Sequence, residues 1–181
     1  MGGGAMTSAD EAYQMLEAVG NGDAEFWRTY GVVDPQTDVA TSPVFLLSVF
    51  MRVLLDELFP QQPSVEAVDR FVTAAAERAP RAAAVLTADY ARASILACFD
   101  AEQARLVQRE GSMERVSAVI ILLSTAAGLS EERIRLGLND LEEMLSDSQS
   151  PDHPHHEAVM ELRLTAESIA RQTQSHDPST I

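Results

Sequence analysis

Two stretches of the chain carry apolar side chains on nearly every side of a helix. In residues 116–127 (VSAVIILLSTAA), large aliphatic side chains occupy all sides of a 3.6-residue repeat. In residues 43–59, only Arg52, Asp56 and Glu57 form a polar edge. A helix without a polar face has to be enclosed by its neighbours, so we expect the two stretches to pair in the interior or at a subunit interface.

Residues that favour helix ends bound both stretches. Ser112 is placed to cap the first stretch, and Gly128 stands where a left-handed residue would end it. Ser42 followed by Pro43 begins the second. The β-branched residues of the first stretch also suit a buried strand, but its capped length favours a helix, and it is shorter than the roughly 20 apolar residues of a membrane span.

One-sided apolar patterns predict the remaining helices. Ser8 and Glu11 have the spacing of a capping box at the start of the first helix, which is expected to end at Gly20. The spacing of Leu138, Leu141 and their neighbours is the clearest amphipathic pattern in the chain. These further helices are expected at residues 8–20, 24–31, 64–79, 81–109, 130–145 and 155–172.

The fold class that follows is all-α: a compact bundle of about seven to eight helices around the apolar helices 43–59 and 112–127. We expect a disordered leader at residues 1–7, a single helical domain at 8–173 and a disordered tail at 174–181. Two helices that are apolar nearly all round exceed what one small core usually encloses, so a homodimer is expected.

Charge excludes several classes of function. The chain holds 28 acidic and 13 basic residues, for a net charge of −15, and all the basic residues are Arg. Without Lys there is no Schiff base, no Lys general base and no P-loop. The negative charge repels phosphate backbones and anionic lipids, so neither nucleic acid nor a membrane is expected as a partner.

The single cysteine, Cys98, lies in an apolar run and has no partner for a disulfide within the chain. Residues 1–6 carry neither the basic region nor the apolar core of a secretory signal. We therefore expect a protein of the reducing cytoplasm.

The aromatic residues Phe26, Trp27 and Tyr30 gather on the short helix predicted at 24–31. They have two interpretations. The rings can cover one end of the core, or they can form a patch that binds a partner or a ligand, since large rings on a peripheral element are frequent interface anchors.

The histidines His153, His155 and His156 are weak metal candidates. Pro154 separates them, and the chain has no H-E-x-x-H, no E-x-x-H and no Cys pair. We therefore assign no metal, no cofactor and no catalytic residue. The carboxylates Asp140, Glu143 and Asp147 are interpreted as a solvated helix face.

Residues 125–138 (TAAGLSEERIRLGL) resemble the turn of a helix-turn-helix. Glu131 and Glu132 would then face the phosphates, so an ordinary helical hairpin is the better interpretation.

These observations favour a non-enzymatic interaction or regulatory protein that binds an unidentified protein partner. The alternative is a small-molecule-binding helical domain, similar in architecture to the effector domains of transcriptional regulators but without a DNA-binding module. That alternative predicts a cavity of roughly 300 Å³ or more between the helices 43–59 and 116–127. Enzyme status is undecided, and an enzyme is the least favoured of the three classes.

Overall fold

Every regular element in the described residues is an α-helix, which confirms the all-α prediction. The computed structural model describes residues 6–30 and 42–147. The predicted helix at 155–172, the leader before residue 6 and the tail at 174–181 lie outside these ranges. The described helices are α1 (Ser8–Asn21), α2 (Ala24–Tyr30), α3 (Pro43–Leu58), α4 (Val65–Arg78), α5 (Pro80–Ala84), α6 (Ala88–Leu96), α7 (Ala101–Glu110), α8 (Met113–Ala126) and α9 (Glu131–Asp147).

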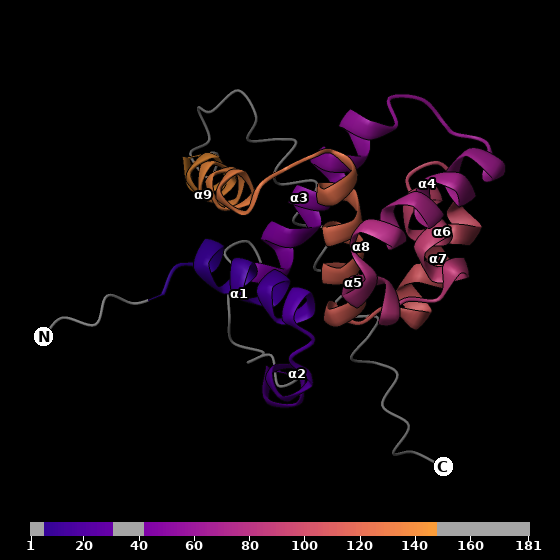
Figure 1. Ribbon diagram of the computed structural model, residues 1–181. Coiled ribbons are helices and arrows are strands. Elements are labelled where there is room, and N and C mark those ends of the chain that lie inside the picture. Colours follow the sequence, from indigo (N-terminus) through magenta and orange to yellow (C-terminus); the bar gives the residue numbers. More distant parts are fainter. Residues whose placement is uncertain (1–5, 31–41, 148–181) are drawn as a thin grey trace, which may run out of the picture.

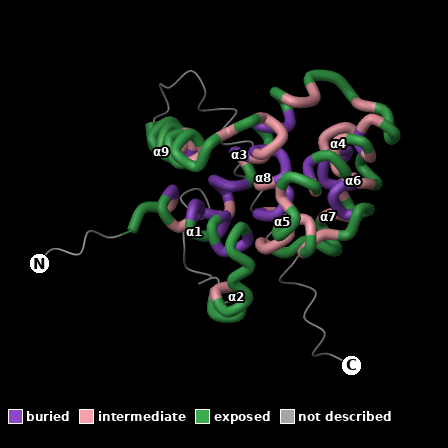
Figure 2. The backbone as a smooth tube through the Cα atoms, in the orientation of Figure 1, coloured by how far each residue is buried: buried purple, intermediate pink, exposed green. Residues whose placement is uncertain are grey.

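Helix α8 lies at the centre of the bundle, as its sequence predicts. It packs against α1, α3, α4 and α5, and none of its residues is exposed (Figures 1 and 2). Ser112 caps its first turn by accepting a hydrogen bond from the backbone N–H of Arg115. Gly128 follows its last turn in the left-handed region, with φ of 69°. The chain by itself encloses α8, so this helix does not need a second subunit for burial.

Helices α3 and α8 form the most extensive contact between any two described helices, which confirms the expected apolar pair. Leu47 and Leu54 of α3 and Leu123 of α8 belong to one core cluster. Ser42 caps α3, and Pro43 occupies its first turn, as expected. The C-terminal half of α3 reaches the surface, where Val53 is 46% exposed.

The predicted continuous helix at 81–109 is wrong, because the chain forms α5, α6 and α7 there instead. The Thr87 hydroxyl accepts a hydrogen bond from the backbone N–H of Tyr90 and begins α6. The Asp100 carboxylate accepts from the backbone N–H of Glu102 and begins α7. Side chains of this kind offer the backbone N–H groups partners outside a continuous helix, and here they start two new helices.

The N-terminus of α1 is capped one residue earlier than expected. Thr7 accepts a hydrogen bond from the backbone N–H of Asp10, and the Asp10 carboxylate accepts one from the backbone N–H of Thr7. The capping box is therefore Thr7 with Asp10, whereas Ser8 with Glu11 was expected. The two pairs have the same spacing, so spacing alone does not distinguish them.

Glu142 of α9, which is distant in the sequence, also caps the N-terminus of α1. Its Oε1 accepts a hydrogen bond from the backbone N–H of Ser8 at 2.9 Å, and its Oε2 accepts from that of Ala9 at 3.3 Å. A carboxylate at a helix N-terminus satisfies unpaired N–H groups and interacts favourably with the helix dipole. Glu142 thus fixes α9 to the start of α1.

Replacing Glu142 with glutamine is expected to lower the free energy of unfolding by about 1 kcal/mol, because one acceptor and the negative charge are lost. Urea unfolding followed by circular dichroism measures this. Glu143→Gln is the matched control, since Glu143 is exposed on the same helix. Equal losses in the two variants would contradict the role of Glu142 as a cap.

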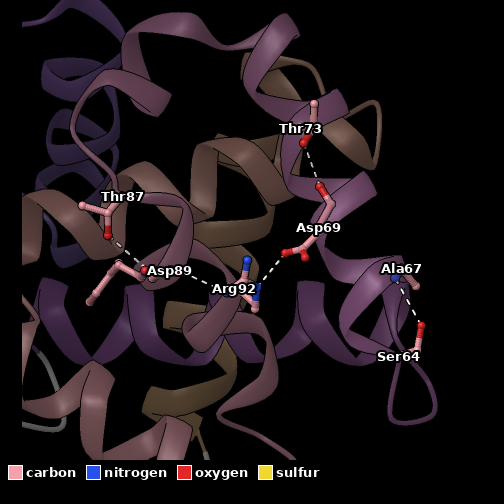
Figure 3. Close-up of polar contacts among 8 residues, drawn as sticks. Ser64, Ala67, Asp69, Thr73, Thr87, Asp89 and Arg92 are labelled. Carbon is pink, nitrogen blue, oxygen red and sulfur yellow. Dashed lines mark hydrogen bonds and ion pairs between the residues drawn. The ribbon is translucent and has the colours of Figure 1, made fainter.

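Arg92 of α6 joins α6 to α4 (Figure 3). Its Nε lies 2.6 Å from Asp69 Oδ1 on α4, and its Nη1 lies 2.9 Å from Asp89 Oδ1 on its own helix. The hydrogen bond to Asp69 raises the pKa of Arg92 above its ordinary value, with the negative charges of Asp69 and Asp89 adding to the effect. The contact with Asp69 joins α6 to α4, while the contact with Asp89 lies within α6.

Candidate functional site

A tight turn between α1 and α2 sets the direction of α2. Gly22 has φ of 70°, which a residue with a Cβ adopts at a cost. Its N–H donates to the Val19 carbonyl at 3.1 Å, and the Asp23 N–H donates to the Ala18 carbonyl at 2.8 Å. These two bonds form a Schellman motif. Helix α1 therefore ends at Asn21, one residue after the predicted end at Gly20, and Gly22 is its C-cap.

Asp23 then begins α2, as the sequence indicates. Its Oδ1 accepts hydrogen bonds from the backbone N–H groups of Glu25 and Phe26, at 3.1 Å and 3.0 Å. At the other end, the Thr29 hydroxyl donates to the Glu25 carbonyl at 2.8 Å. The Asp23 carboxylate is thus held in a fixed position beside the first turn of α2.

The aromatic rings of α2 cover one end of the core. Phe26 and Trp27 pack edge to face, with centroids 5.1 Å apart and planes at 83°. Phe26 contacts the larger core cluster, while Trp27 contacts both clusters of buried residues. Both rings are half-buried, so they also contribute to the surface. The side chain of Tyr30, the third predicted member, lies outside the described part of the structure.

A solvent-open hollow of about 410 Å³ lies beside these rings, and we call it the α2 hollow. Among the described residues, Asp23, Glu25, Phe26 and Thr29 line it. Figure 2 shows α2 as a mostly exposed helix at the edge of the molecule. Among the described residues, neither Asp23 nor Glu25 forms an ion pair. The hollow therefore combines an aromatic ring with two carboxylates that form no ion pair with a described residue.

The sequence indicated the ring in this hollow but not its polar neighbours. Glu25 and Thr29 are four positions apart and Phe26 and Thr29 are three apart, so the three share one side of α2. A helical projection of α2 would have placed them together.

The other candidate residues, which are the three histidines and the cysteine, do not form a metal or catalytic site within the described residues. His153, His155 and His156 lie outside them, and within them no group of three or more His, Cys, Asp or Glu side chains is arranged to hold a metal ion. Burial raises the pKa of the Cys98 thiol, while nearby Arg52 opposes the shift. The thiol form is therefore favoured, as expected for an inert cysteine.

Helix α9 carries the acidic surface that its sequence predicts. Asp140, Glu143 and Asp147 are all exposed. The chain bends by 117° between α8 and α9, which lies in the range of about 90–120° of helix-turn-helix motifs. Helix α9 nevertheless begins with the exposed carboxylates of Glu131 and Glu132, so the charge argument against a DNA-binding role still applies.

Helices α3 and α8 pack directly against each other. Leu47, Leu54 and Leu123 are almost completely buried there. A ligand-binding role for this helix pair stays a prediction, with no feature of the described residues in its favour.

Comparisons with known proteins add no identification. No family model, curated protein or solved structure matches the chain. In the described ranges, no single helix combines the length and the apolar character that a membrane span requires.

Proposed function

We propose that the protein is a non-enzymatic interaction or regulatory protein that binds a partner protein through α2. The observation that carries the proposal is the α2 hollow, where the half-buried Phe26 adjoins exposed polar side chains. Aromatic anchors surrounded by polar groups are typical of the residues that contribute most to protein–protein affinity. The expected homodimer and cytoplasmic location belong to the same proposal and rest on the sequence.

The position of α2 supports this use. Among the described helices, α2 makes extensive contact with α1 alone, and Figure 1 shows it apart from the central helices. The anchoring of Phe26 and Trp27 on the core reduces the conformational entropy that binding would remove from these side chains. A partner would therefore meet a rigid aromatic surface.

Site-specific photo-crosslinking in cells of the native host tests the proposal. A p-benzoylphenylalanine at Thr29, on the rim of the hollow, is expected to give a discrete crosslinked product with a partner protein. Thr73 on α4 is the matched control, because it is also an exposed helical threonine whose hydroxyl donates to the carbonyl four residues earlier. The absence of a product from position 29, or the same products from both positions, would contradict the proposal.

A further inference from the structure

We infer that α7 is a hinged lid, which opens as a unit while the rest of the bundle stays folded and thereby exposes Tyr90 of α6. The inference concerns a different part of the molecule from the α2 hollow and does not depend on the proposed function. Its basis is the shallow packing of α7, a buried hydroxyl without a described partner at its C-terminal end, and one side chain of α8 that holds this end in place.

Helix α7 is packed less deeply than the other helices of similar length. None of its ten residues is buried, whereas each of the other described helices with nine or more residues buries at least two. Among the described helices, α7 makes extensive contact with α6 alone, and Figure 1 shows the two side by side. Segments with few buried apolar contacts open at a lower free energy than the core of a protein. We therefore expect α7 to open before the whole chain unfolds.

Non-helical residues bound α7 at both ends. A turn at residues 97–99 separates it from α6. At its other end, Gly111 and Ser112 are extended, with φ of −68° and −134°. Hinge motions are absorbed by a few residues at the ends of elements. Helix α7 can therefore move without breaking the hydrogen bonds within α6 or α8.

The C-terminal end of α7 covers the hydroxyl of Tyr90. This residue has no exposed surface, and a Cβ at Gly111 would lie 3.4 Å from its hydroxyl oxygen. Within the described ranges, that hydroxyl has no hydrogen-bond partner, since the Ser94 hydroxyl donates instead to the backbone carbonyl of Tyr90. A polar group buried without a partner is costly, and water can bind it once α7 moves away. The closed form therefore carries a cost that the open form does not.

Arg115 of α8 acts as the latch that opposes this opening. Its Nη1 donates to the backbone carbonyl of Glu110, the last residue of α7, at 2.8 Å. Its guanidinium lies 5.3 Å from the centroid of the Tyr90 ring, within the range of about 6 Å for a cation–π contact. Hydrogen bonds from a charged donor are stronger than those between neutral groups. Arg115 thus fixes the end of α7 to the central helix.

Native-state hydrogen exchange of the full chain, followed by NMR, tests the inference. Under conditions in which exchange reports the opening equilibrium, the slowest amides of α8 measure global unfolding. The slowest amides of α7 are expected to be at least about 10-fold less protected than those of α8. Equal protection of the two helices would overturn the inference, because α7 would then open only when the whole chain unfolds.

Two variants act in opposite directions on the opening. Tyr90→Phe removes the hydroxyl and keeps the ring, so it is expected to raise the protection of α7 by about 3-fold or more. Arg115→Met removes the latch and is expected to lower that protection by about 3–10-fold. In each variant α8 is expected to change by the same factor as α7, since global unfolding breaks the same contacts. If Arg115→Met does not fold, Arg115→Lys is expected to act in the same direction with a smaller effect.

Tyr13 of α1 and Arg135 of α9 provide matched controls, because they form a second pair of this kind, with the guanidinium 4.1 Å from the ring centroid. Tyr13→Phe and Arg135→Met are expected to leave the protection of α7 unchanged, whatever they do to α8, since opening of α7 leaves this pair intact. Unchanged or reduced protection of α7 in Tyr90→Phe would overturn the inference. So would an effect of the control variants on α7 as large as that of Tyr90→Phe and Arg115→Met.

Discussion

Leu123→Ala is expected to lower the free energy of unfolding by about 2–5 kcal/mol, the largest effect that we predict for this chain. Leu123 has no exposed surface and lies in α8, where it belongs to the main core cluster. Truncation removes apolar contacts and leaves a cavity, because helices packed on several sides cannot close over the gap. A typical domain is stable by only about 5–15 kcal/mol, so this is a large fraction of the total.

Leu136→Ala is the matched control, since Leu136 is 53% exposed on α9. A surface substitution of this kind is expected to change stability by no more than about 0.5 kcal/mol. Urea unfolding monitored by circular dichroism compares the two variants. If Leu123→Ala does not fold, the milder Ile120→Val is expected to cost about 0.5–1.5 kcal/mol, because Ile120 is also fully buried in α8. Equal effects at Leu123 and Leu136 would contradict the central position of α8.

The centre of the fold could be predicted from the sequence because burial leaves a strong local signal there. An apolar run with no polar face, bounded by Ser112 and Gly128, has few alternatives to an enclosed helix. The same argument predicted the partner helix α3. Both predictions depend on residues within one helix, so they needed no information about distant parts of the chain.

The division of residues 81–109 into three helices is less evident in the sequence. Alanine and leucine throughout this region favour a helix, while the starts of α6 and α7 depend on single side chains, Thr87 and Asp100. A threonine or aspartate is compatible with both a helix interior and a cap. The apolar repeat therefore suggested continuity where local hydrogen bonds produce breaks.

Long-range features had no detectable sequence signal. Ser8 and Glu142 are 134 residues apart, and no local rule associates a carboxylate on α9 with the start of α1. The candidate site could be predicted only in part. Its rings were identified by composition, but the α2 hollow also depends on the direction that the turn at Gly22 gives to α2.

Gly111→Ala is expected to destabilise the protein by about 1–2 kcal/mol, because the added methyl group would overlap a neighbouring helix end. A Cβ at Gly111 would lie 2.6 Å from the carbonyl oxygen of Val107 and 3.4 Å from the hydroxyl of Tyr90. Backbone conformation is not the cause, since φ of −68° at Gly111 suits any residue. Either the end of α7 or the start of α8 would have to move.

Gly20→Ala provides the control with the opposite sign. Gly20 lies within α1, and a Cβ there would meet no atom within 4 Å. Alanine is expected to raise stability by about 0.5–1 kcal/mol, since it restricts the unfolded chain and favours the helix. Thermal and urea unfolding of the two variants measure the difference. A rise in stability for both would show that the junction between α7 and α8 can relax, and would contradict the close contact at Gly111.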